Sequence, residues 1–270
     1  MSTQRTGGGF SALVASLTIV IALIIGFSIY QFVFGDPANF SGLEKGKVAE
    51  ASHPLNTFGT IYKGGIIVPF LVAVNLVVII FSVERAFGLF SARGKKNLNG
   101  FISNVQESLD NNDIAGAIEL CDSQKGSIAN VIRSGLEKYE FVQNDASLDR
   151  EAKIDAIKKE IEDTVALEMP MMSKNLVIIS TCASIGTLIG LIGTVVGMIK
   201  SFQAMGAGTP DTSKLSVGIS EALINTFFGI FASTLAIIVY NYFTTKIDQL
   251  THAMDEAGYA IVQNFTARNK

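Results

Sequence analysis

The chain has 270 residues, of which 49% are hydrophobic and only 17% are charged, and its mean hydropathy is +0.40. This balance fits a membrane protein with a substantial aqueous part better than a soluble enzyme. The net charge of -3 is too small to indicate nucleic acid or an anionic surface as a partner.

Residue types that carry enzymatic or metal chemistry are scarce. Cys121 lies in a polar region and Cys182 in an apolar one, so a disulfide between them is not expected. The two histidines, His53 and His252, lack the spacing of zinc ligands. The sequence contains no P-loop, no dinucleotide fingerprint and no nucleophile with an evident base. It therefore predicts a protein that is not an enzyme and that uses neither a cofactor nor a metal.

Four apolar segments reach the length of roughly 20 residues that a membrane-spanning helix requires. We expect an all-α membrane protein with transmembrane helices at 10–34, 64–87, 176–204 and 217–243. The first segment could instead be a cleaved signal peptide with Arg5 as its basic region. Its apolar run is too long for a typical signal peptide, however, and no clear cleavage site follows. A retained helix is the expectation.

Lysine and arginine near the ends of the segments predict the orientation. The basic residues that favour the cytoplasmic side are Arg85, Arg93, Lys95, Lys96, Lys174 and Lys246. The difference in basic residues between the two sides is reduced by three lysines in the first loop, Lys45, Lys47 and Lys63. The best fit places both termini in the cytoplasm. The expected order is a cytoplasmic N-terminus at 1–9, an outer loop at 35–63, a cytoplasmic helical region at 88–175, a short outer turn at 205–216 and a cytoplasmic C-terminal helix at 244–270.

The polar region 88–175 shows the periodicity of helices. Two apolar sets recur at helical spacing: Phe101, Ile102, Val105 and Leu109, and then Ile128, Val131, Ile132 and Leu136. Asp113 can cap a helix over 114–121. The run 148–169 has an apolar stripe flanked by lysine and glutamate, which is typical of an exposed amphipathic helix. Pro170 marks a kink or boundary, beyond which that helix could continue almost unbroken into the third span.

The third span contains the sequence GLIGTVVGMIKSF, which starts at Gly190. Four glycines with the spacing 4, 3, 4 form a groove of small residues that lets helices approach closely in lipid; they are Gly186, Gly190, Gly193 and Gly197. Thr187 and Thr194 are seven residues apart and fall on nearly one line of the helix. These threonines could face a pore, or they could bond back to their own helix.

The fourth span carries two polar sets. Glu221 and Asn225 are four residues apart and can hydrogen-bond, whereas Thr226 and Ser233 share another face, roughly 140 degrees away on an ideal helix. Polar groups at this depth usually line a protein interface or a hydrated path. Glu221 could be held near the outer boundary by a neighbouring helix or by water, or it could relay ions.

At these residues the chain resembles the ExbB/TolQ/MotA family of ion-driven motor stators, and within it the ExbB and TolQ branch. GLIGTVVGMIKSF looks like the glycine-rich membrane motif of the family, and GISEALINTFFGIFASTLAIIVYNYF looks like its last helix. DIAGAIELCDSQKGSIANVIRSGLEKY is similar to the cytoplasmic helices that precede this pair. The resemblance covers about residues 64–242.

The resemblance implies a multi-pass protein of the bacterial inner membrane that forms a homopentamer. The pentamer would surround the helices of a single-span partner resembling ExbD or TolR, which supplies the ion-carrying aspartate. Thr194 and Thr226 match the threonines that face this aspartate, and Glu221 matches the glutamate of the last helix. Thr187, Asn225 and Ser233 are candidate accessory polar residues. The ion would be the proton, with sodium also open.

The implied task is to energise outer-membrane transport through a TonB-like protein in the periplasm. Two departures from the family pattern stand out. The segment 10–34 adds a helix to the usual three, and Asn225 stands where a small apolar residue is common. A TolQ-like, gliding-type or flagellar-type stator is an alternative within the family. A self-contained transporter, which should show inverted repeats, and a structural membrane scaffold are the alternatives of other classes.

Overall fold

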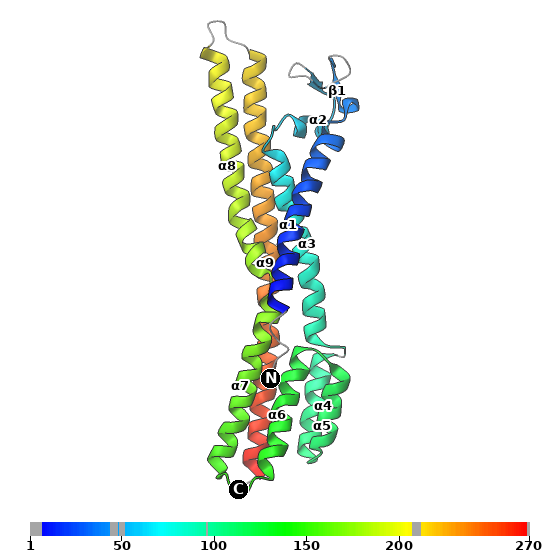
Figure 1. Cartoon of the computed structure of the whole chain (residues 1–270), viewed down its shortest axis with the longest axis vertical. Helices are drawn as coiled ribbons and strands as arrows, with labels where there is room; N and C mark the ends of the chain where they lie inside the picture. The colour runs from blue at the N-terminus through cyan, green and yellow to red at the C-terminus, as the bar shows by residue number, and fades with distance from the viewer. Residues whose placement is uncertain (1–6, 44–47, 49–51, 96, 207–211, 269–270) are drawn as a thin grey trace. The chain divides into compact units, whose positions relative to one another are not determined.

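The computed structural model describes residues 7–43, 48, 52–95, 97–206 and 212–268, and its regular structure is almost entirely helical (Figure 1). The α-helices are α1 (Gly7–Ile29), α2 (Thr57–Tyr62), α3 (Val68–Arg93), α4 (Leu98–Asp110), α5 (Ile114–Gln124), α6 (Ser127–Gln143), α7 (Arg150–Ser173), α8 (Leu176–Gly206) and α9 (Thr212–Arg268). The chain forms two compact units, one of residues 1–82 with 175–240 and one of residues 83–174 with 241–270.

Four helices among the described residues are long and apolar enough to cross a membrane. They are α1 with the π-helical turn that follows it (Tyr30–Phe34), α3, α8 and α9. This confirms the prediction of an all-α membrane protein with four transmembrane helices. Helix α9 continues without a break from the fourth span to Arg268.

In the first unit, α1 packs closely against α3. A methyl group on Gly26 would lie 2.8 Å from the Pro69 carbonyl oxygen, so only glycine permits this approach. The rings of Phe27 and Phe70 meet edge to face with their centroids 5.2 Å apart. The additional N-terminal helix is therefore a packed part of this unit.

The loop after α1 contains structure that the sequence did not predict. A 3-10 turn (Pro37–Asn39) leads into strand β1 (Phe40–Ser41), which pairs antiparallel with β2 (His53–Pro54). The buried Asn39 holds this loop together, because its amide nitrogen donates to the Val33 carbonyl at 2.7 Å and its oxygen accepts from Asn56 at 2.8 Å. Other predicted features lie outside the described residues: Arg5, Lys45, Lys47, Lys96 and the middle of the 205–216 turn.

The second unit is a helical bundle of α4 to α7 and the C-terminal part of α9. Both apolar sets predicted for 101–109 and 128–136 are buried, and Asp113 caps α5 by accepting from the Gly116 amide at 2.8 Å. A matching stripe on α9 completes the core; it comprises Ile247, Leu250, Met254, Ala257, Ile261 and Phe265. Tyr139 packs edge to face on Phe265, and its hydroxyl donates to Asn264 at 3.3 Å.

The junction after α7 differs from the expectation. Pro170 lies inside α7, and the helix ends three residues later at Ser173, so it does not continue into the third span. The interruption is sharp because Asn175 has a φ of 61°, in the left-handed region. Arg85, which the orientation argument treated as a membrane-end cation, is buried here. Its guanidinium pairs with Glu84 and donates to the Met171 and Met172 carbonyls, each at 3.3 Å, and so caps the end of α7.

We expect Cys121 to resist thiol reagents while the protein is folded. Burial, followed by the charge of the adjacent Asp122, raises the pKa of this thiol to about 12. The reactive thiolate is therefore almost absent at pH 8. A Cys182→Ser variant leaves Cys121 as the single cysteine, so absorbance from a disulfide reagent reports on it alone. Labelling should be slow at pH 8 and complete in denaturant; rapid labelling of the folded protein would contradict the bundle described above.

Candidate functional site

The contact between α8 and α9 is built on glycine. Gly186, Gly190, Gly193 and Gly197 are all buried. A methyl group on Gly197 would lie 2.6 Å from the Gly218 carbonyl oxygen, and one on Gly190 would lie 3.0 Å from the Asn225 carbonyl oxygen. The backbones of the two helices thus touch almost directly, as small residues permit in lipid.

This close approach brings the predicted threonines together. The hydroxyls of Thr194 and Thr226 are 2.5 Å apart, and two turns away those of Thr187 and Ser233 are 2.7 Å apart. Each member of the first pair also touches a carbonyl of its own helix, Thr194 at Gly190 (3.1 Å) and Thr226 at Ala222 (3.0 Å). Each of these threonines can therefore bond back to its own helix, which was one of the two alternatives, and the two also contact each other across the helix pair.

The hydroxyl pairs are neutral groups in apolar surroundings. Thr194 and Thr226 are half-buried, so each keeps part of its surface open. Exposed apolar side chains flank them on both helices: Leu191, Val195, Leu223 and Phe227. A hydroxyl can donate one hydrogen bond and accept others, which suits it to stabilise a passing proton or cation without binding it tightly.

Glu221 has a different partner. Both of its carboxylate oxygens accept from the Lys200 ammonium, at 2.7 and 2.8 Å. The Glu221 side chain is only 4% exposed, whereas that of Lys200 is 51% exposed. Sequence analysis missed this lysine, although it stands in the glycine-rich motif. A signal was available: an antiparallel register that places residue 194 opposite residue 226 places residue 200 next to residue 221.

Asn225 and Glu221 share a face of α9, and their spacing allowed a hydrogen bond between them. Their hydrogen bonds go to other partners instead. The Asn225 amide nitrogen donates to the Gly64 carbonyl at 2.9 Å. The Asn225 amide oxygen is buried without a hydrogen-bond partner among the described residues. Gly65 has a φ of +78° and lies against the Glu221 carboxylate, so a side chain there would be both strained and obstructed. The segment before α3 therefore covers the carboxylate of Glu221.

The arrangement limits the possible chemistry. No group of three or more histidine, cysteine, aspartate and glutamate residues in the described part of the chain could hold a metal ion. Within the two apolar spans 176–204 and 217–243 the acidic group is Glu221, and the Lys200 ammonium pairs with it. The two hydroxyl pairs are neutral polar contacts between these spans, and neither contains a titrating group.

Replacement of Gly197 by alanine should separate α8 from α9. The new methyl group would meet backbone atoms, which cannot rotate away, and overpacking of this kind costs about 1–3 kcal/mol. Gly206→Ala is the matched control, since it stands on the same helix with nothing within 4 Å. Thermal unfolding in detergent, followed by circular dichroism at the helix band, should show a lower midpoint for Gly197→Ala alone. Equal midpoints would contradict the glycine contact.

Loss of Lys200 should destabilise the protein more than loss of the Glu221 charge. Lys200→Met leaves a buried carboxylate unpaired, whereas Glu221→Gln leaves an ammonium that is already half in solvent. Breaking a fully buried pair costs about 3–5 kcal/mol, and the exposure of Lys200 lowers that figure here. The double variant should melt above Lys200→Met alone, because it removes the stranded charge. A double variant that melts at or below the single variant would count against the pair.

The chain is similar to known proteins over the region that contains these contacts. The MotA/TolQ/ExbB proton channel family matches residues 123–256, a range that includes both hydroxyl pairs and Lys200 with Glu221. The chain is 24% identical over 181 residues to the Tol-Pal system protein TolQ of Pseudomonas aeruginosa, an alignment that covers 67% of this chain and 78% of that protein.

Two proteins named ExbB are also similar. The biopolymer transport protein ExbB of Pseudomonas putida is 28% identical over 203 residues, which is 73% of this chain and 59% of that protein. The ExbB of Aquifex aeolicus is 32% identical over 108 residues, which is 40% of this chain and 73% of that protein. With the four apolar helices and the paired motifs of α8 and α9, these similarities show that the chain is a multi-pass membrane protein that belongs to the MotA/TolQ/ExbB proton channel family.

Proposed function

We propose that this chain is the pore-forming stator subunit of an ion-driven motor in a bacterial inner membrane, with both termini in the cytoplasm. The observation that carries the proposal is the contact of the Thr194 and Thr226 hydroxyls across the glycine-packed α8–α9 pair. Two hydroxyls from separate helices form one polar step between exposed apolar side chains. Membership of a proton channel family supports the assignment of that step to an ion path.

The chain supplies the wall of this path but not its titrating group. Lys200 neutralises Glu221, so we assign Glu221 to an anchor that fixes the outer end of the helix pair. The resemblance to ExbB and TolQ supports a homopentamer around an ExbD-like or TolR-like helix whose aspartate takes up the ion. A charged aspartate is more stable beside the hydroxyls of Thr194 and Thr226, whereas a neutral one can also lie against the apolar side chains that flank them. Because one charge crossing 100 mV releases about 2.3 kcal/mol, alternating protonation can bias rotation of the partner.

The protein that receives this motion distinguishes two candidate roles. Similarity to the ExbB of Pseudomonas putida favours the energising of outer-membrane transport through a TonB-like protein. Similarity to the TolQ of Pseudomonas aeruginosa favours a role in a Tol-Pal system. Both roles use the same pore chemistry, and we propose the first. Affinity purification of the tagged chain from its own cells, with identification of the single-span partner, discriminates between them. Consistent absence of a partner with a membrane aspartate would point instead to a scaffold or a self-contained transporter.

Thr194→Val and Thr226→Val should abolish most ion flux while leaving the complex assembled. Valine has the shape of threonine without the hydroxyl, so it removes the polar step and keeps the packing. A hydroxyl that stabilises the passing ion by about 1.4 kcal/mol is worth about tenfold in rate. The measurement is proton flux into liposomes that contain the chain with its partner, read with a pH-sensitive dye. Repetition with a sodium-sensitive dye identifies the ion.

The matched control is Thr181→Val, which makes the same change on the same helix. Thr181 is exposed, and its hydroxyl donates to the Val177 carbonyl of its own helix at 2.7 Å. Flux should be unchanged in this variant, and Thr194→Ser and Thr226→Ser should retain it as well. Full flux in both valine variants would overturn the proposed path.

A further inference from the structure

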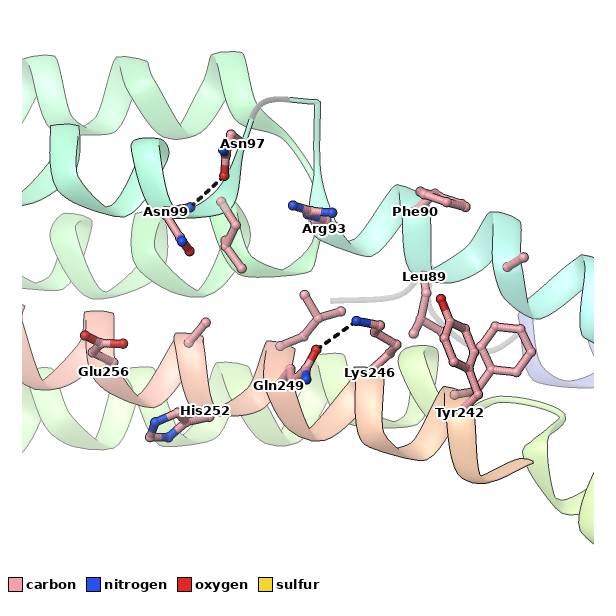
Figure 2. A pocket seen from close by; sticks show the side chains of 15 residues that line it. Leu89, Phe90, Arg93, Asn97, Asn99, Tyr242, Lys246, Gln249, His252 and Glu256 are labelled. Carbon is pink, nitrogen blue, oxygen red and sulfur yellow. Dashed lines mark hydrogen bonds between the residues drawn. The ribbon is translucent and has the colours of Figure 1, made fainter. Parts of the chain in front are cut away.

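A groove of about 570 Å³ lies in the second unit, whereas the hydroxyl pairs belong to the first. Its walls are the last turns of α3, the start of α4 and the part of α9 from Tyr242 to Glu256. Figure 2 shows the side chains that line it. Along α3 and α9 these residues follow directly after the apolar stretches that span the membrane. The groove therefore follows in sequence on the apolar stretches of two helices that are long enough to span a membrane.

The lining changes in character along the groove. Phe90 and Tyr242 stand at one end, and Asn99, His252 and Glu256 at the other, with Arg93 and Lys246 between them (Figure 2). Phe90 is 70% exposed and Tyr242 is 58% exposed, so the apolar end is open to whatever surrounds the protein. The order is apolar, then cationic, then polar and uncharged or acidic. A molecule that fits this order has a hydrocarbon part, an anionic part and a polar head.

The two cations are available for a ligand. Lys246 donates to the neutral Gln249 side chain at 3.1 Å and lies 5.9 Å from the Tyr242 ring centroid. The ion pairs found in the described part of the chain involve neither Lys246 nor Arg93. Arginine and lysine are the usual partners of phosphate oxygens. One acidic residue, Glu256, lines the polar end, so the groove as a whole carries an excess of one positive charge.

We propose that this groove binds an anionic phospholipid, with its phosphate between Arg93 and Lys246. The acyl chains would lie along Leu89, Phe90 and Tyr242, and the hydroxyls of a glycerol headgroup would meet Asn97, Asn99 and Gln249. Charge complementarity selects the occupant, since a phosphatidylglycerol carries one negative charge against the excess positive charge of the groove. A choline headgroup would add a cation beside two others. The proposal depends on the membrane-spanning assignment of α3 and α9 and not on the ion path.

The test is native mass spectrometry of the full chain in detergent, with added phosphatidylglycerol or phosphatidylcholine of identical acyl chains. The wild-type protein should retain phosphatidylglycerol in preference to phosphatidylcholine. Arg93→Gln and Lys246→Gln should each lower that preference about fivefold, the effect of one juxtamembrane cation. Phe90→Ser should lower the retention of both lipids alike. The two glutamine variants stand on separate helices, so the test survives if one of them fails to fold.

Arg133→Gln is the matched control, because it removes one positive charge from α6, where Arg133 pairs with Asp122 and Glu137. It should keep the wild-type preference. Equal retention of the two lipids by the wild-type protein would overturn the proposal, as would a preference that both glutamine variants keep. A change in subunit number without a change in lipid preference would also overturn it and would identify a second copy of the chain as the occupant.

Discussion

The candidate site depends on the close contact between α8 and α9, where glycine leaves almost no side chain between the two backbones. Hydrophobic burial does not drive helices together in lipid, so packing and polar contacts must hold them. Glycine at 186, 190 and 197 meets Gly218, Gly229 and the backbone of Asn225, and Gly193 meets the Asn225 side chain. The register follows from this fit, and both the Thr194–Thr226 contact and the Lys200–Glu221 pair follow from the register. A methyl group at Gly197 would disturb all of them together.

The buried carboxylate of the fourth span, Glu221, is paired with a lysine of the third span. Burial of the Glu221 carboxylate without a partner would be costly. The Lys200 ammonium neutralises this charge, while half of the lysine side chain stays exposed. Gly65 and Gly64 close over the same face of α9, with Gly64 accepting from Asn225. The threonine face is thereby left without a fixed charge. An ion path lined only by hydroxyls requires that the titrating group belong to another protein, as the proposed mechanism assumes.

Sequence reasoning recovered the elements whose signals are local. The four spans, the Asp113 cap and the buried stripes of the second unit follow from hydropathy and helical periodicity. What it missed depends on contacts between distant residues. Nothing local marks Arg85 as a cap for α7, because the carbonyls that it binds are 86 and 87 residues away. Nor does anything local mark Asn39 as the centre of the outer loop, since its partners are the Val33 carbonyl and the Asn56 amide of other segments. Lys200 is intermediate between the features with a local signal and those without one. Its pairing required the α8–α9 register, and the seven-residue spacing of the threonines contains enough information to derive it. That the groove in the second unit exists could not be predicted, since α3, α4 and α9 contribute to it from three separate parts of the chain.

The Thr194–Thr226 contact has one further consequence. Each hydroxyl carries a single hydrogen, yet the two oxygens take part in three close contacts, one with each other and one with each helix's own carbonyl. Two hydrogens cannot occupy three contacts. Because two oxygens 2.5 Å apart need a hydrogen between them, one hydrogen lies in that contact and the other can reach only one of the two carbonyls. The pair therefore has two hydrogen-bond orders of opposite polarity, related by rotation of the hydroxyls alone. In the proposed ion path, such a pair accommodates transfer in either sense, and the direction is then decided by groups outside this contact.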